Sequence, residues 1–202
     1  IRDVALWSSG LLERHMGGEG IKPPQPSGLW SALMHPRSDT KNYVRDTDAR
    51  QYCRSVYVYW KRTCPHPMLT LFDAPSRESS CVKRSRTNTS LQSLGLLNET
   101  QRIEAARMLA ERLMHAAEND HERLDLLFLW LTCRKPNDIE QAACRRLLET
   151  NRAHFSQTIV DVEALLTTGD IARDTALDAA EHASWTQVAV TILASDLVIM
   201  LY

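Results

Sequence analysis

The residues with the most chemical capability lie between Tyr52 and Asn98, and the densest group among them is cationic. Four cations fall within ten consecutive positions: Arg77, Lys83, Arg84 and Arg86. Guanidinium groups bind anions through paired hydrogen bonds, so this segment could clamp an anionic ligand. The favoured interpretation is structural, because a loop without regular backbone pairing needs side-chain partners. The candidate ligand or structural motif consists of Asp73, Arg77, Glu78, Arg84, Asn88, Gln92 and Asn98.

Two carboxylates in this stretch admit a catalytic alternative. Asp73 or Glu78 could be the acid or base of a hydrolase-like enzyme acting on polysaccharide, provided that a concave pocket raises the pKa of one carboxyl. Aromatic faces nearby could stack on a sugar, although their helical spacing favours core packing. These aromatic residues are Tyr52, Tyr57, Tyr59 and Trp60. Catalytic residues stay unassigned, and whether the chain is an enzyme stays open.

Sequence signatures of metal, cofactor and nucleophile sites are missing. The seven histidines include no pair at i,i+4 spacing and no H-E-x-x-H, so no metal site is predicted. The five cysteines form no C-x-x-C and no haem-attachment C-x-x-C-H, and we expect free, buried thiols. No G-x-S-x-G elbow, P-loop or G-x-G-x-x-G occurs, so no cofactor is predicted in this segment.

The composition is that of an ordinary globular protein. The 202 residues carry a net charge of -1, which provides no global field to attract nucleic acid or an anionic membrane. The most apolar run, Val188 to Tyr202, contains Ser195 and Asp196 and is too short to span a bilayer. The length suffices for one sizeable core, and we expect a single domain over residues 1–202.

The N-terminal half, residues 1–98, is predicted to be rich in loops. Ile1 to Met16 has a helical pattern that Gly17 and Gly18 would end, and no capping residue precedes it, which predicts the C-terminal piece of a larger domain. Gln51 to Thr63 has a strand-like composition, but we favour helix because no second strand of similar quality is available. Met68 to Phe72 is at most a helical turn, and Asp73 to Thr87 is irregular.

The C-terminal half, residues 99–202, is predicted to be an antiparallel helical bundle, which makes the fold class mainly α. Capping signals, in which a polar side chain precedes a run of helical periodicity, recur from Thr89 onward. One long helix, or two pieces broken near Ser156, follows Pro136. The predicted helix starts are Thr89–Gln92, Asn98–Gln101, Asn119–Glu122, Asn137–Glu140 and Thr175–Asp178.

Several segments, taken together, resemble the C-terminal part of the planctomycete-type domain of unknown function 1553. They cover the first half of the chain well and the remaining helices more loosely. Cys53 and Cys64 depart from the pattern, and residues 194–198 lack the Asn and the acidic–Phe pair typical of its end. The matching segments include Gly17-Gly18, Gln25 to Trp30, Tyr52 to Tyr57, Trp60 to Thr63, Phe72 to Pro75, Arg77-Glu78, Cys81, Arg84, Thr87 to Thr89, Leu91 to Leu94 and Leu97-Asn98.

The resemblance implies an extracytoplasmic protein, in the periplasm or at the cell surface, whose neighbouring domains include c-type cytochromes. No activity is established for the family, so no catalytic residue carries over. We therefore expect a helical module that docks other domains of the same polypeptide and binds an anionic or saccharide ligand. The alternatives are the polysaccharide hydrolase based on Asp73 and Glu78, or a docking partner for a c-type cytochrome domain. No nucleic acid and no membrane span are expected.

Overall fold

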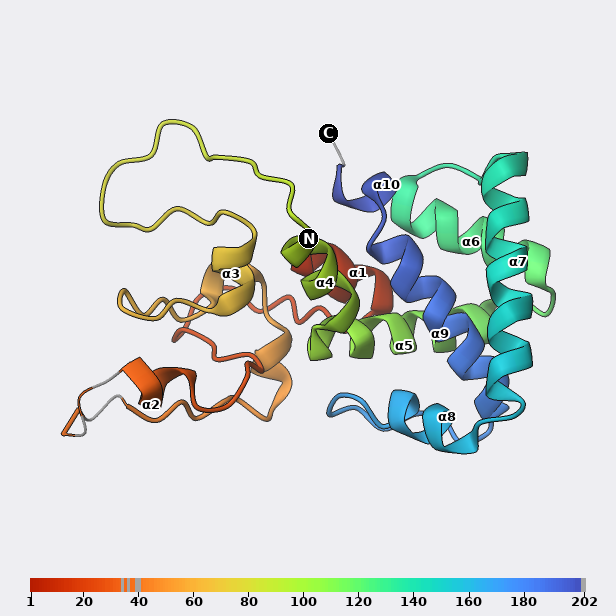
Figure 1. Ribbon diagram of the computed structural model, residues 1–202, viewed down its shortest axis with the longest axis horizontal. Coiled ribbons are helices and arrows are strands. Elements are labelled where there is room, and N and C mark those ends of the chain that lie inside the picture. Colours follow the sequence, from red (N-terminus) through yellow and green to blue (C-terminus); the bar gives the residue numbers. More distant parts are fainter. Residues whose placement is uncertain (34, 36, 39–40, 201–202) are drawn as a thin grey trace. The chain divides into compact units, whose positions relative to one another are not determined.

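The protein is described by a computed structural model that covers residues 1–33, 35, 37–38 and 41–200 (Figure 1). These residues form ten α-helices and two 3-10 helices, and no strand longer than an isolated bridge occurs among them. The packed helices lie mostly in the C-terminal half, which confirms the mainly α prediction. Two compact units make up the chain, one of residues 13–95 and one of residues 1–12 with 96–202. The expectation of a single domain cut from a larger one stays a prediction.

The helical unit contains residues 1–12 and 96–202. Its helices are α1 (Arg2–Ser9), the end of α4 (Ser90–Asn98), α5 (Thr100–Ala116), α6 (Asp120–Thr132), α7 (Asp138–Phe155), α8 (Ile159–Leu166), α9 (Ala179–Leu193) and α10 (Asp196–Ile199). Helix α9 packs against α5, α7 and α8, and α1 packs against α5 (Figure 1). The core between them is built from aliphatic and aromatic side chains, with Leu109, Phe128 and Trp185 fully buried.

Local capping chemistry sets most helix starts in this unit, as predicted. The Asn119 side chain accepts from Glu122 N at 2.9 Å, and Asn137 forms a reciprocal capping box with Glu140. Asp178 caps α9, where its side chain accepts from Glu181 N at 2.8 Å. The segment after Pro136 forms two helices broken near Ser156, not one long helix, because α7 ends at Phe155 and α8 begins at Ile159.

Two predicted boundaries in the helical unit are wrong. Helix α1 ends at Ser9 rather than at Met16, because Gly10 takes a left-handed conformation (φ 83°) and its N–H donates to Trp7 O. Helix α5 is capped by Glu99 rather than by Asn98. The Glu99 carboxylate accepts from Gln101 N and Arg102 N, while Asn98 is the last residue of α4.

The loop-rich unit, residues 13–95, contains little regular structure. Its elements are α2 (Leu29–Leu33), η1 (Ala49–Tyr52), η2 (Ser55–Tyr57), α3 (Pro67–Leu71) and the first part of α4. A small core forms from Ile21, Cys53 and Val58. Helix α3 agrees with the predicted helical turn at 68–72, and Asp73 to Thr87 is irregular as predicted.

The predicted helix from Gln51 to Thr63 is wrong. Two 3-10 turns occupy its first half, and the chain then pairs with a segment far away in sequence. Ile21 N donates to Tyr57 O and Tyr59 N donates to Ile21 O, each at 2.8 Å. The strand-like composition therefore reflects a short extended stretch, in which Val58 forms an isolated bridge with Ile21 instead of pairing with a second strand. Cys53 forms another isolated bridge, with Glu13.

Candidate functional site

Arg84 holds the C-terminal end of α3. The last carbonyls of a helix have no partner within the helix, and a cation there also complements the helix dipole. Arg84 Nε donates to Asp73 O at 2.7 Å, and its Nη2 donates to Phe72 O. The next carbonyl back, Leu71 O, accepts from Gln92 Nε2 at 2.8 Å. Arg84 and Gln92 thus donate to the backbone carbonyls at the end of α3 and just after it.

Asp73 turns the chain away from α3 and closes the loop that follows. Its backbone is left-handed (φ 56°), a conformation that Asp tolerates better than most residues. Its Oδ2 accepts from the N–H and from the hydroxyl of Thr87, both at 2.8 Å. These hydrogen bonds, with a smaller contribution from the Arg84 charge, hold the pKa of the Asp73 carboxyl below its usual 3.8.

Gln92 joins the loop to α4. It forms the predicted capping box, in which Thr89 N donates to Gln92 Oε1 at 3.1 Å and Gln92 N donates to Thr89 Oγ1 at 3.3 Å. Its amide nitrogen also donates to Thr87 Oγ1 at 3.0 Å. Only 7% of Gln92 is exposed, so these bonds lie out of water and hold the start of α4 against the end of α3.

Arg77 and Glu78 make contacts that do not involve this network. The Arg77 guanidinium lies over the Trp60 ring, 4.8 Å from its centroid, and Arg77 also has a left-handed backbone (φ 62°). Glu78 forms a two-pronged ion pair with Arg62, with Nε to Oε1 at 2.7 Å. The hydrogen bonds from Arg62 lower the pKa of the Glu78 carboxyl.

The two asparagines of the motif lie apart from these contacts. Asn88 is exposed in the loop just before the α4 cap, and Asn98 is exposed in the part of α4 that belongs to the helical unit. The structure therefore brings together Asp73, Arg84 and Gln92, places Arg77 and Glu78 against neighbouring side chains, and leaves both asparagines outside the cluster.

The aromatic residues predicted to share a helical face are dispersed instead. Tyr52 is buried, the Tyr57 hydroxyl accepts from Gly17 N at 2.9 Å, and Trp60 lies under Arg77. Tyr59 packs near Trp30, with ring centroids 5.9 Å apart. Their contacts support local packing and provide no shared stacking platform.

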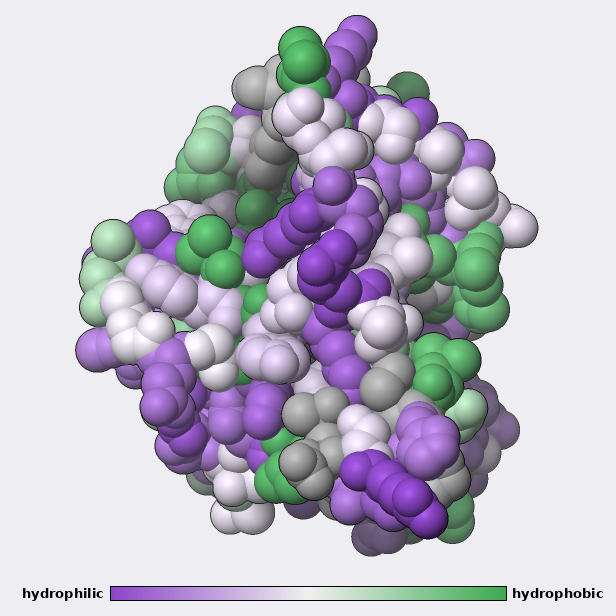
Figure 2. All heavy atoms as spheres, turned by 90° about the vertical axis from the view of Figure 1, so that its left-hand side faces the viewer, coloured by the Kyte–Doolittle hydropathy of each residue, from purple (hydrophilic) through white to green (hydrophobic). Residues whose placement is uncertain are grey.

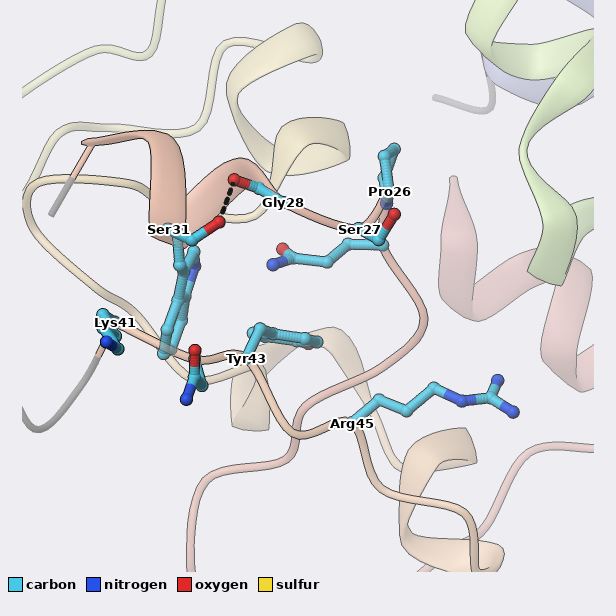
Figure 3. A pocket seen from close by; sticks show the side chains of 10 residues that line it. Pro26, Ser27, Gly28, Ser31, Lys41, Tyr43 and Arg45 are labelled. Atoms are coloured by element: carbon cyan, nitrogen blue, oxygen red, sulfur yellow. Dashed lines mark hydrogen bonds between the residues drawn. The ribbon is translucent and has the colours of Figure 1, made fainter. Parts of the chain in front are cut away.

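Sequence reasoning missed a pocket in the loop-rich unit. It has a volume of about 430 Å³ and is built from residues 25–31 and 41–45 (Figure 3). Trp30 and Tyr43 meet edge to face in its wall, with ring centroids 4.8 Å apart. The signal in the sequence is the run from Gln25 to Trp30, which belongs to the family pattern. No local spacing links this run to residues 41–45.

Cysteines, metal ligands and membrane helices add little to the site. All five thiols are free, and Cys81 and Cys133 are exposed, against the expectation that the thiols are buried. Within the described residues, no group of three or more His, Cys, Asp or Glu side chains is arranged to hold a metal ion. The described helices include none with the length and apolar character needed to cross a bilayer.

A family model matches more than half of the chain. The family model PSD1, described as "Protein of unknown function (DUF1553)", matches residues 1–148. This span covers all of the loop-rich unit and ends within α7. No curated protein matches the chain, and no solved structure matches it.

Proposed function

The chain belongs to the DUF1553 family, whose members have no characterised function, and we propose that it is a non-catalytic helical module of an extracytoplasmic multidomain protein. Its role in this proposal is to dock partner domains of the same polypeptide. The observation that supports it is the use made of the motif. The polar groups of Asp73, Arg84 and Gln92 form hydrogen bonds with the end of α3 and with the loop between α3 and α4. In this proposal they hold the loop in a fixed conformation on the surface.

The docking surface in this proposal consists of residues 75–91 and Leu94. Every residue from 75 to 91 is exposed. Val82 is fully exposed, and Leu91 and Leu94, one helical turn apart on α4, are 61% and 57% exposed. Lys83 and Arg86 provide positive charge between these apolar positions. A segment held firmly at both ends, with apolar and cationic side chains outward, suits a partner that is itself preorganised.

The chemistry of this surface indicates an acidic partner. In the view of Figure 2, hydrophobic side chains occur in small groups separated by hydrophilic ones. Within the docking surface, Lys83 and Arg86 likewise lie between the apolar residues Val82 and Leu91. Such a mixed surface gains specificity from charge complementarity more than from apolar area. The family resemblance supplies the candidate, a c-type cytochrome domain, which in this proposal presents an acidic face to the docking surface.

The hydrolase alternative gains no support from the carboxylates. A general acid at neutral pH needs a raised pKa, whereas hydrogen bonds lower the pKa of both Asp73 and Glu78. The Glu78 carboxylate is paired with Arg62 at the surface. Neither carboxylate lines the pocket at residues 25–45. We therefore do not assign acid–base roles to them.

The test is a titration of the chain with a c-type cytochrome domain from a protein of this family, at low salt. Reversing two charges of the docking surface, Lys83→Glu with Arg86→Glu, should weaken binding at least about tenfold, since like charges then face the acidic partner. The matched control is Arg14→Glu with Arg54→Glu, at two exposed positions of the same unit. Equal loss in both variants, or no loss in either, would contradict the docking surface. No binding of the unmodified chain would remove the cytochrome domain as its partner.

A further inference from the structure

We infer that the pocket formed by residues 25–31 and 41–45 is a binding site for an acidic saccharide, that is, a sugar that carries a carboxylate. The inference is independent of the docking proposal, because the pocket shares no residue with the docking surface. Its volume of about 430 Å³ falls in the range of about 300–1,000 Å³ that is usual for small-molecule sites. The lining residues are Gln25, Pro26, Ser27, Gly28, Trp30, Ser31, Lys41, Asn42, Tyr43 and Arg45.

The two walls of the pocket are tied together at their base. Lys22 N donates to Asp46 Oδ2 at 2.7 Å, and Asp46 N donates back to Lys22 O at 2.9 Å. The Tyr43 hydroxyl donates to Pro23 O at 2.5 Å, and His66 contacts Pro24 O at 3.1 Å from the other side. These bonds hold the proline-rich segment beside residues 42–46. A wall fixed in this way loses little conformational freedom when a ligand binds.

The charge of the lining favours an anion. Lys41 and Arg45 lie on opposite sides of Tyr43 in the pocket wall (Figure 3). No carboxylate occurs among the described residues that line the pocket. Lys61 Nζ also lies 3.9 Å from the centre of the ring of Trp30, which lines the pocket. The described lining therefore carries two cationic side chains and no carboxylate, although the whole chain has a net charge of -1.

The uncharged lining favours a ligand with hydroxyl groups. Amide and hydroxyl side chains both donate and accept hydrogen bonds, as sugar hydroxyls do, and Gln25, Ser27 and Asn42 provide them here. Ser31 donates to Gly28 O at 2.9 Å and keeps its lone pairs for a donor (Figure 3). The Tyr43 ring adds an apolar surface of the kind on which sugar rings pack.

Two buried donors beside the pocket have no acceptor among the residues that the structure describes. They are the amide nitrogen of Gln25 and the indole nitrogen of Trp30, in a residue that is 5% exposed. Buried donors are nearly always paired in folded proteins, so each of these two donors indicates an acceptor that the described residues do not provide. An acceptor-rich ligand brings oxygen atoms to this side of the pocket. The unpaired donors, the cationic side chains and the amide and hydroxyl groups all favour a saccharide that carries a carboxylate.

The experiment is an NMR titration of the ¹⁵N-labelled chain with D-galacturonate, D-galactose, acetate and inorganic phosphate. We expect saturable shifts of the Trp30 indole N–H and the Tyr43 amide with D-galacturonate, and affinities at least about tenfold weaker for each of the other three. Equal binding of acetate or phosphate would reduce the site to an anion site and overturn the saccharide. Equal binding of D-galactose would show that the carboxylate is not recognised. Absence of a saturable shift would overturn the site.

Variants separate this inference from the docking proposal. Lys41→Gln with Arg45→Gln should weaken D-galacturonate binding at least about tenfold while leaving the cytochrome titration unchanged. Lys83→Gln with Arg86→Gln, which removes the same charge from the docking surface, should leave D-galacturonate binding unchanged. The Trp30 indole resonance in the absence of sugar verifies that each variant is folded. Unchanged sugar binding in the pocket variant, or equal loss in both variants, would contradict the assignment.

Discussion

Asp73 Oδ2 accepts two hydrogen bonds from Thr87, one from its backbone N–H and one from its hydroxyl, each at 2.8 Å. A single carboxylate oxygen thus joins the residue that leaves α3 to the residue that approaches α4. The segment between them is exposed throughout from residue 75 onward, so the closure depends on its ends. This relationship explains how a run of polar and charged residues can be structural, because these groups bond the loop that contains them.

Gln92 should be the most sensitive motif position for stability. Gln92→Leu removes the donor to Leu71 O and Thr87 Oγ1 in a side chain that is 7% exposed. Both hydrogen bonds are partly buried, and an unpaired buried group costs about 1–3 kcal/mol, so we expect a loss of about 2 kcal/mol here. Urea unfolding measures it, with Ser93→Ala, an exposed neighbour on α4, as the control. Equal unfolding midpoints for the two variants would contradict the role of Gln92.

Gly169 should tolerate no side chain. Its φ is +99°, and an added Cβ would overlap Glu104 Cδ. Glu104 cannot move aside at no cost, because its Oε1 accepts from Asp170 N at 2.7 Å and from Ile171 N at 2.8 Å. Gly169→Ala should therefore cost about 3 kcal/mol in unfolding free energy, combining backbone strain with lost contacts.

The control for Gly169 is Gly17→Ala. Gly17 has a similar φ of +88°, with no heavy atom within 4 Å of an added Cβ, so that variant isolates the backbone term at about 1 kcal/mol. Thermal unfolding of both variants compares them. If the two alanines destabilised the chain equally, the close approach of Glu104 would not matter.

His182 should make stability fall on mild acidification. It is fully buried, its Nε2 donates to Arg107 O at 3.0 Å, and Nδ1 has no partner among the described residues. Burial, the largest cause, lowers the pKa of His182 below 6.5. The unfolded chain binds this proton first as the pH falls below 6.5, so the contribution is complete above that pH and is lost as the pH falls toward the folded-state pKa.

The measurement for His182 is the thermal midpoint at about pH 7 and about pH 5, on either side of the usual pKa of histidine. His182→Gln keeps a donor for Arg107 O but does not titrate. The unmodified chain should lose more stability between the two pH values than this variant does. A pH dependence that is the same in both chains would contradict the buried neutral imidazole.

Arg102 should be essential to the helical unit. Its Nη2 donates to Leu193 O at 2.7 Å and its Nε donates to Leu96 O at 3.2 Å, which ties the ends of α4 and α9 to α5. Burial lowers the pKa of Arg102 to about 10, which leaves it charged at neutral pH. Arg102→Met should cost about 3 kcal/mol in urea unfolding, because two carbonyls lose their donor. Arg146→Met on the exposed side of α7 should cost almost nothing, and a similar loss there would point to a general charge effect.

Local signals predicted the helical unit well. The starts of α6, α7 and α9 depend on a polar side chain that bonds the backbone three residues on, so a short window of sequence contains the whole interaction. The predicted cap Asn98 is wrong by one residue, because the Glu99 carboxylate accepts from the N–H groups of Gln101 and Arg102 at the start of α5. Such errors of one residue leave the fold intact.

Long-range pairing was beyond local reasoning in the loop-rich unit. Val58 forms an isolated bridge because Ile21, far upstream, provides the backbone partners of Tyr57 and Tyr59 on either side of it. The pocket likewise joins residues 25–31 to residues 41–45, and no spacing rule links Trp30 to Tyr43. The motif residues were found, but their partners were not, since Arg84 binds backbone carbonyls that carry no sequence signal.

The most direct test of a structural Asp73 is the pH titration of the Thr87 amide proton by NMR. Hydrogen bonding to the carboxylate lowers the pKa of Asp73, so the Thr87 amide shift should titrate with a midpoint below 3.8, and the loop should lose this closure only as the pH falls through that midpoint. The Thr87 shift should become insensitive to pH in this range in Asp73→Asn. A midpoint above 3.8, or a Thr87 amide that does not respond to Asp73, would contradict the structural role and return the carboxylate to consideration as a catalytic acid.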